Sequence, residues 1–254
     1  MEADGMVEPG SAADRAERLT RTSRDQGHPN LRPRDSATLI LIDRAEAVPK
    51  VLLGRRHARH RFLPGKFVFP GGRIEASDRR MQSGKPLNES VVASLMQRVK
   101  RPSAAKAAAF ALAAVRETYE ETGLMLGLPH PAPIAAPSSD WEAFAEAGIL
   151  PDLSALHFIA RAITPPGRPR RFDSRFFAAD VSAIARRDDG FVGPDAELVE
   201  LVWLPINEAR SLDMPGITAV VLEELQDRIA GGMRPDHPAP LYRMIHKRFV
   251  REIL

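Results

Sequence analysis

A long alanine-rich segment, residues 103–123, lies in the middle of the chain and predicts one largely buried helix. Ser103 suits the N-cap position, because its hydroxyl can accept a hydrogen bond from a backbone N–H of the first turn. Gly123 suits the end, because glycine adopts the left-handed conformation that closes many helices. The apolar run AAKAAAFALAAV contains Lys106 and is shorter than the roughly 18 residues of a membrane span. We therefore expect a helix with one face in the core of the protein.

The C-terminal end of this predicted helix carries three carboxylates, Glu117, Glu120 and Glu121. Positions i, i+3 and i+4 share one helical face, so these like charges repel at a cost of a few tenths of a kcal/mol per exposed pair. Two interpretations fit the spacing. The face is a solvated acidic surface, or it holds hard divalent cations such as Mg2+ or Mn2+, which prefer oxygen ligands.

Length and charge limit the classes of partner. The 254 residues suit one domain with additions, or at most two small ones, and the formal net charge is +3. The chain has no basic run interleaved with aromatic residues and no helix-turn-helix or zinc-finger spacing. Arginine suits planar, bidentate contacts with phosphate. We therefore expect a small anionic molecule as the partner and no nucleic acid.

Two absences bear on the compartment. The chain contains no cysteine, which excludes disulfides, thiolate metal sites and a cysteine nucleophile. The N-terminal region lacks the apolar core of a signal peptide, and its acidic residues argue against an organellar transit peptide. We expect a cytoplasmic protein that does not bind a membrane.

The pattern of apolar runs predicts one main domain. Residues 1–35 are polar and without apolar period, which predicts a flexible N-terminal tail. Residues 36–254 form the predicted domain, in which residues 79–102 are interpreted as an insertion with a short helix starting at Asn88. The predicted strands are ATLILID, KVLLGRR, KFVF, SALHFIARAI, RRFDSRFFAAD and AELVELVWLP, and TAVVLEELQDRIAG is a second long helix. This order favours an α/β (α+β) fold with a sheet between helices.

A glycine-rich turn, FPGGRIEASD, precedes the acidic helix and can bring backbone carbonyls close to an ion. Together with RETYEETGL it resembles the Nudix signature, Gly-x5-Glu-x7-Arg-Glu-U-x-Glu-Glu-x-Gly-U, where U is aliphatic; Gly72 opens it. The first acidic position is Asp78 instead of Glu, and Thr118 replaces an aliphatic residue. The step from Asp78 to Arg116 is 38 positions, about 30 more than the signature allows.

This resemblance extends to one branch of the Nudix family. The branch that contains the peroxisomal acyl-coenzyme A diphosphatases carries an insertion at the same place, and TPPGRPRRFDSRFF is also similar to it. The similarity covers residues 37–212. It implies a Nudix-type α/β/α sandwich with a mixed sheet, and a long insertion between a loop and a helix is compatible with it because loop-closure entropy grows slowly with length.

The resemblance also implies roles for particular residues. Glu117, Glu120, Glu121 and the Gly72 carbonyl would bind Mg2+ or Mn2+, and Arg116 would orient the carboxylates by ion pairing. Among Asp195, Glu197 and Glu200 we favour Glu197 as a further ligand or base, with a solvated acid at a strand edge as the alternative.

The segment LLGRRHARHRFLPGKFVFPGG resembles the signature of coenzyme A-directed Nudix enzymes, with Arg56, Arg61 and Gly65 in register. Arginines can clamp phosphates through charge-assisted, bidentate bonds. The alternative is a solubilising edge strand. Arg171, with Arg170 and Asp173, forms a second candidate contact set, for which a salt-bridged strand start is the alternative.

The function implied is a metal-dependent diphosphatase that cleaves coenzyme A or acyl-coenzyme A to a phosphopantetheine and adenosine 3′,5′-bisphosphate. Two alternatives stay open: a Nudix pyrophosphatase for ADP-ribose or NADH, and a non-catalytic Nudix-like binding module. The insertion is a lid, a wall of the substrate site, or the contact of a homodimer.

Overall fold

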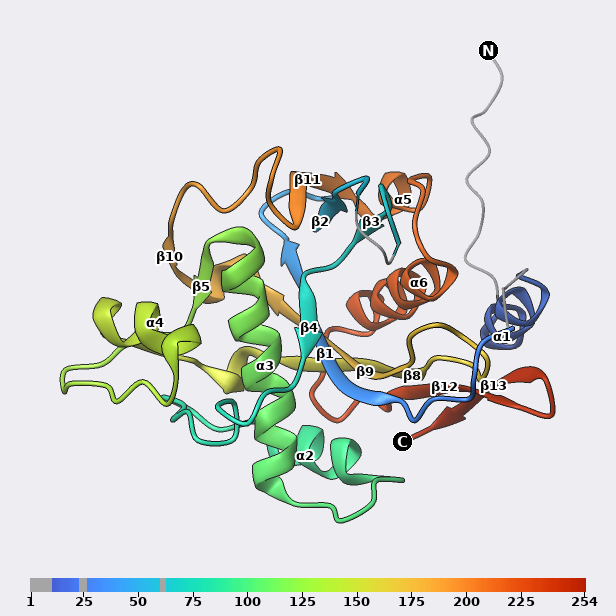
Figure 1. Cartoon of the computed structure of the whole chain (residues 1–254), viewed down its shortest axis with the longest axis horizontal. Coiled ribbons are helices and arrows are strands. Elements are labelled where there is room, and N and C mark those ends of the chain that lie inside the picture. The colour runs from blue at the N-terminus through green and yellow to red at the C-terminus, as the bar shows by residue number, and fades with distance from the viewer. Residues whose placement is uncertain (1–10, 23–26, 60–62) are drawn as a thin grey trace.

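Helices cover both faces of a nine-stranded mixed sheet in the computed structural model, which describes residues 11–22, 27–59 and 63–254 (Figure 1). α3 (Ala104–Thr122) packs on one face, where it contributes to the larger hydrophobic cluster. α6 (Gly216–Ala230) packs on the other face with a second cluster. The predicted α/β/α sandwich with a mixed sheet is confirmed.

The sheet brings distant parts of the chain together. Its strand order is β11-β2-β1-β9-β8-β12-β13, with β3 beside β2 and β4 beside β1. β1 pairs in parallel with β9, and β8 with β12, while the other pairs are antiparallel. The strands are β1 (Arg34–Asp43), β2 (Lys50–Arg56), β3 (Phe67–Val68), β4 (Gly71–Arg73), β8 (His157–Ile163), β9 (Phe172–Asp180), β11 (Leu198–Pro205), β12 (Pro240–Ile245) and β13 (Arg248–Ile253).

Shorter elements flank this sheet. β5 (Leu124–Leu126) pairs with β10 (Ile184–Arg187), and β6 (Leu128–Pro129) pairs with β7 (Ile149–Leu150). The other helices are α1 (Ala12–Arg21), α2 (Glu89–Met96), α4 (Glu142–Ala147) and α5 (Ile206–Ala209). In the part of the chain that the structure describes, no helix is both long and apolar enough to cross a membrane.

The six predicted strand segments match β1, β2, β3, β8, β9 and β11, and the second predicted long helix matches α6. α3 also ends as predicted. The Ser103 hydroxyl accepts a hydrogen bond from the Lys106 N–H at 3.1 Å, and Gly123 adopts a left-handed conformation with φ of 73°. Four alanines of α3, Ala109, Ala111, Ala113 and Ala114, are fully buried and let its backbone approach β1 closely, which fixes where the last turn of the helix lies.

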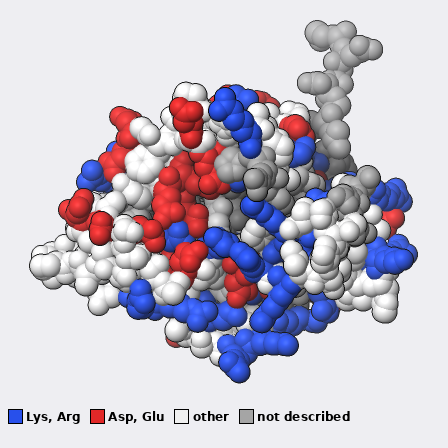
Figure 2. Space-filling model, viewed as in Figure 1, with Lys and Arg blue, Asp and Glu red and all other residues white. Residues whose placement is uncertain are grey.

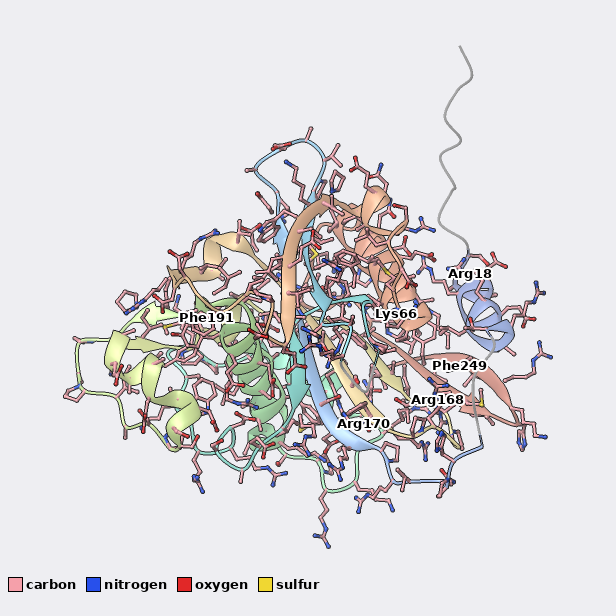
Figure 3. All side chains as sticks on the ribbon, turned by 45° about the horizontal axis from the view of Figure 1, so that its top comes forward. Arg18, Lys66, Arg168, Arg170, Phe191 and Phe249 are labelled. Carbon is pink, nitrogen blue, oxygen red and sulfur yellow. The ribbon has the colours of Figure 1, made fainter. Side chains whose placement is uncertain are left out.

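The N-terminal region differs from the flexible tail that the sequence predicts, because Ala12–Arg21 form the helix α1 packed on α6 and β13. Arg15 is 3% exposed and forms ion pairs with Glu223, Glu224 and Asp227. Figure 3 shows Arg18 on α1 near Phe249 of β13, whose N–H donates to the Thr20 hydroxyl. Buried ion pairs, rather than a broad apolar face, hold this helix, so hydrophobic periodicity gives little sign of it.

The predicted insertion forms part of the core. α2 begins as expected, with the Asn88 side chain accepting a hydrogen bond from the Ser90 N–H at 3.0 Å. Its apolar side chains are buried in the same cluster as α3, namely Met81, Leu87, Val91 and Leu95. This packing fixes both ends of the insertion relative to the helix that carries the acidic residues.

Candidate active site

The last turns of α3 place the acidic residues against the glycine turn that leads into β4. The Gly71 N–H donates a hydrogen bond to the Glu121 carboxylate at 3.2 Å. The Glu117 carboxylate lies so close to Gly72 that a methyl group on this residue would overlap it. A larger residue at position 72 would therefore displace the Glu117 carboxylate from this place. Two of the three predicted carboxylate ligands, Glu117 and Glu121, thus lie next to the Gly71–Gly72 backbone.

An ion pair joins the two halves of the interrupted motif. Arg116 Nε lies 2.8 Å from Asp78 Oδ1, and Arg116 Nη2 donates to Asp78 Oδ2 at 3.1 Å and to the Arg73 carbonyl at 3.0 Å. The Arg116 side chain is 3% exposed and that of Asp78 is fully buried. Asp78 thus faces Arg116 and not the acidic surface, although 38 positions separate the two residues.

The same guanidinium holds two of the carboxylates. Arg116 Nη1 lies 3.0 Å from Glu117 Oε1 and 3.0 Å from Glu120 Oε2. Burial by itself lowers the pKa of Arg116, but its hydrogen bonds to Asp78 and the charges of Glu117 and Glu120 raise the pKa above its ordinary value. Arg116 is therefore a permanent positive charge beneath the acidic surface.

Burial and like charge act on all three carboxylates. Burial raises the pKa of Glu117 to about 7, and Arg116 opposes this while Glu120 adds to it. The pKa of Glu120 is raised, mainly by burial. Burial, then the charges of Glu197 and Glu117, raise the pKa of Glu121 well above its ordinary value. A cation placed among these groups would remove the repulsion.

Glu197 and Arg56 lie beside this acidic group. Arg56 Nη2 is 2.8 Å from Glu197 Oε1, and the Arg56 side chain is 13% exposed. Glu197 precedes β11, and the pairing of β11 with β2 brings it next to Arg56. Glu200, by contrast, pairs with Arg55 at the exposed edge. Of the two glutamates, Glu197 is the one that the sheet directs to the motif.

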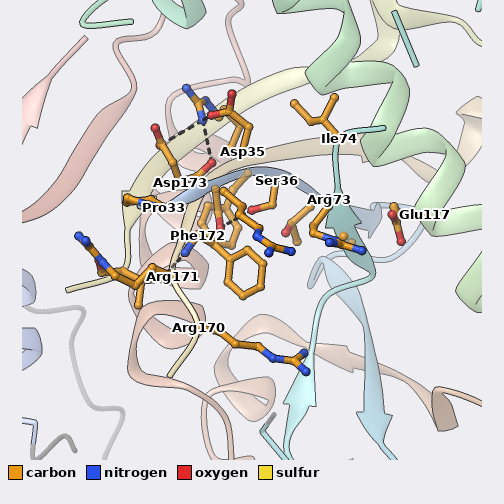
Figure 4. A pocket seen from close by; sticks show the side chains of 18 of the residues that line it. Pro33, Asp35, Ser36, Arg73, Ile74, Glu117, Arg170, Arg171, Phe172 and Asp173 are labelled. Atoms are coloured by element: carbon orange, nitrogen blue, oxygen red, sulfur yellow. Dashed lines mark hydrogen bonds and ion pairs between the residues drawn. The ribbon is translucent and has the colours of Figure 1, made fainter. Parts of the chain in front are cut away.

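These residues line one end of a large cavity of about 1730 Å3. Glu117, Glu121, Gly72, Glu197 and Arg56 all contribute to its wall. Figure 4 shows Glu117 on one side of this pocket and Arg170 and Arg171 on the other, with Arg73 between them. The cavity exceeds the roughly 300–1,000 Å3 of ordinary ligand pockets.

Some predicted site residues lie elsewhere. Glu120 and Gly65 do not line the cavity, and Gly65 occupies a turn with φ of 70°. Arg171 lines it, but its donors are bound to the Asn30 side chain and to the carbonyls of Leu31 and Thr164. Arg61 lies outside the described residues.

Comparison with solved structures identifies the fold. The chain is similar to a NUDIX hydrolase from Alicyclobacillus acidocaldarius, with 29% sequence identity and a TM-score of 0.58, over 76% of this chain and 90% of that one. The chain has the Nudix hydrolase fold. More distant similarities include the NUDIX domain of Shewanella oneidensis NrtR, crystallised with ADP ribose, at 12% identity and a TM-score of 0.44 over 84% of this chain and 97% of that one. No protein-family model matches the chain.

The donor set of this Nudix fold suits a hard divalent cation. Among the described residues, no three acidic or histidine side chains are already arranged as a metal cluster. Glu117 and Glu120 are both paired with Arg116. The Gly72 backbone beside Glu117, and the mutual repulsion of buried carboxylates, are the features that Mg2+ or Mn2+ would use through oxygen ligands.

Sequence reasoning left two features of the site unassigned. Asp78 stands in the first acidic position of the signature, but its role as partner of Arg116 depends on packing across the insertion. On the far side of the cavity, Arg170 and Arg171 belong to the segment TPPGRPRRFDSRFF, whereas Arg34 and Lys100 come from segments without a motif, so no local pattern marks those two.

Proposed function

We propose that this chain is a metal-dependent hydrolase of a diphosphate that links a nucleoside to another group, and specifically a coenzyme A or acyl-coenzyme A diphosphatase. The observation that carries the proposal is the meeting of both halves of the interrupted motif. Glu117, Glu121 and Gly72 line one end of a large cavity in a Nudix fold, and Arg116, buried in its pair with Asp78, contacts Glu117.

The chain's own groups suit this chemistry. Glu117, Glu120, Glu121 and the Gly72 carbonyl would hold Mg2+ or Mn2+, which when bound stabilises charge on phosphoryl oxygens and activates water. Arg116 fixes the carboxylates. Glu197 accepts the proton of the attacking water, and Arg56 offsets negative charge on the diphosphate. Water adds to one phosphorus, the bridging P–O bond breaks, and both halves leave with a terminal phosphate.

The size and charge of the cavity support an elongated anionic substrate. Coenzyme A fits this description, and the register of Arg56, Arg61 and Gly65 in the second motif supports it.

The test is product analysis with Mg2+ or Mn2+ against coenzyme A, acetyl-coenzyme A, dephospho-coenzyme A, NADH and ADP-ribose. Release of adenosine 3′,5′-bisphosphate from coenzyme A supports the proposal. Hydrolysis of only NADH or ADP-ribose would retain the metal site and replace the substrate, and no hydrolysis with either metal would favour the binding module.

Matched variants assign the activity to the site. Glu120→Gln and Glu121→Gln should abolish turnover and keep the circular dichroism spectrum of the folded protein. Glu142→Gln, an exposed residue of α4, should retain full activity. If Glu120→Gln and Glu121→Gln remain as active as Glu142→Gln, the acidic residues of α3 are not the catalytic group.

A further inference from the structure

The cavity has two ends of opposite charge. Figure 2 shows acidic side chains gathered left of the centre of this face and basic side chains across its lower right. The carboxylates of the motif, Glu117 and Glu121, line it together with Glu197. The basic residues in the wall are Arg32, Arg34, Arg56, Arg73, Arg79, Arg98, Lys100, Lys106, Arg161, Arg170, Arg171 and Arg175.

Several of these cations are already neutralised. Arg161 forms a bidentate pair with Asp173, with contacts of 2.8 and 2.7 Å. Arg175 and Lys106 share Asp35, at 3.0 and 3.2 Å. These pairs build the floor of the cavity between β1, β9 and α3, and they have little net charge to offer a ligand.

Arg56 and Arg98 are also engaged. Arg56 pairs with Glu197 beside the motif, and Arg98 pairs with Glu252 at 2.8 Å. The position of Arg56 assigns it to the diphosphate, which must lie next to the carboxylates. Any further charged group of the substrate must therefore bind to other cations of the cavity.

Three exposed cations have a different environment. Lys100 stands at the end of the insertion, Arg34 begins β1, and Arg170 lies in the loop before β9. Within residues 11–22, 27–59 and 63–254, none of the three forms an ion pair with a carboxylate, and the same holds for two further lining residues, Arg32 and Arg79. Figures 3 and 4 show Arg170 extending from its loop, and Figure 4 places it across the pocket from Glu117.

We propose that Arg34, Lys100 and Arg170, here called the basic end, bind a phosphate monoester of the substrate that is remote from the diphosphate under cleavage. This rests on the proposed function and makes these residues determinants of specificity, not of catalysis. Uncompensated arginine and lysine groups that line the same cavity suit a dianionic phosphate, which offers several acceptor oxygens. The insertion then supplies a wall of the substrate site through Lys100.

A pair of substrates that differ in one phosphate tests this. For the double variant Lys100→Gln, Arg170→Gln, we expect KM for coenzyme A to rise about tenfold or more, since a hydrogen bond to a charged group contributes about tenfold in affinity. KM for dephospho-coenzyme A should change less than about twofold, and kcat should be retained for both.

Matched controls remove the same charges elsewhere. Lys85 is an exposed residue of the insertion and Arg187 an exposed residue of β10, and neither lines the cavity. The double variant Lys85→Gln, Arg187→Gln should behave as the wild type with both substrates. Equal changes in KM for the two substrates, or no change, would overturn the basic end while leaving the hydrolase intact.

A binding measurement separates this inference from the proposed function. Calorimetry with adenosine 3′,5′-bisphosphate and AMP needs no turnover. If the wild type hydrolyses none of the substrates but binds the bisphosphate more tightly than AMP, and the Lys100→Gln, Arg170→Gln variant loses this preference, only the proposed hydrolase activity is wrong. The absence of any preference in the wild type would overturn the basic end.

Discussion

Glu121 is buried, negatively charged and close to other carboxylates. Its ionised form therefore lowers the stability of the folded protein when no metal is bound. It is 7% exposed, and burial followed by Glu197 and Glu117 raises its pKa well above the ordinary value. An acid whose pKa is raised by folding binds more protons in the folded state, so its contribution to stability falls as pH rises above the unfolded value of about 4.5. At pH 8 the ionised group therefore opposes folding.

Glu121→Gln should stabilise the metal-free protein at about pH 8 and abolish activity, because the amide keeps the shape without the charge. Each kcal/mol gained raises Tm by about 2–4 °C in a protein of this size. Thermal melts with and without Mg2+ check this: metal should raise Tm of the wild type by mass action and leave the variant nearly unchanged. Glu142→Gln serves as the control, and a variant less stable than the wild type without metal would contradict the argument.

The buried ion pair between Arg116 and Asp78 should contribute strongly to the stability of the protein. Asp78→Asn leaves a buried guanidinium without its bidentate partner, which should destabilise the protein by about 3–5 kcal/mol. Urea unfolding measures the loss, and Asp189→Asn, an exposed position, is the control. A cost below about 1 kcal/mol would mean that the two halves of the motif are held together by other contacts.

Residues of the site differ in how far sequence reveals them. Glu117, Glu120 and Glu121 lie close together in the chain, at positions i, i+3 and i+4, so helical spacing alone places them on one face. Asp78 meets Arg116 only because the insertion folds back into the core, and no local pattern encodes this contact. Arg170 and Lys100 share a cavity through tertiary packing of separate loops, for the same reason.

Among the elements, α1 shows how a helix can escape hydrophobic analysis. Its buried side chains include one arginine, Arg15, with only Ala16 and Leu19 as apolar neighbours. The sequence does contain a capping box, in which Ser11 and Asp14 bond each other's backbone N–H. This local signal marks the start of the helix, but the docking partners lie more than 200 positions away.

Arg15→Ala should destabilise the protein by about 3 kcal/mol at neutral pH, because Glu223 and Glu224 lose a buried partner. Burial raises the pKa of Glu224, but hydrogen bonds from Arg251, Tyr242 and Arg15 outweigh it and lower the pKa. The contribution of ionised Glu224 to stability is therefore complete at pH values above its unfolded pKa of about 4.5, and it is lost as the pH falls below that value. Urea unfolding at about pH 7 and pH 4 should show a smaller effect of the variant in acid, and an effect independent of pH would contradict this.

The hairpin of β12 and β13 is another element without a strong local signal. Its turn residues, His246 and Lys247, adopt positive φ values of 46° and 64°. Hairpin turns of this kind usually contain Asn or Gly, so their absence here hides the turn. The parallel pairing of β1 with β9 also has no local code, since it joins segments far apart in the chain.

At the scale of the whole molecule, the small net charge of +3 conceals a strong separation of charge across one cavity. Under the proposed function, the acidic end would need a cation before it could accept a diphosphate, whereas the basic end would attract anions directly. Composition could exclude nucleic-acid motifs, but it could not reveal this polarity, because the two ends are assembled by the fold. Such a field concentrates an anionic substrate with a defined orientation.

This polarity predicts a specific dependence on salt. The Debye length falls from about 10 Å at 0.1 M to about 3 Å at 1 M ionic strength, so kcat/KM for coenzyme A should fall about tenfold over this range, mainly through KM. The Lys100→Gln, Arg170→Gln variant should show a shallower slope, and the Lys85→Gln, Arg187→Gln variant the slope of the wild type. Dividing kcat/KM for coenzyme A by kcat/KM for dephospho-coenzyme A at each salt concentration removes effects of salt on metal binding. Parallel slopes in all three proteins would show that the basic end does not attract the substrate.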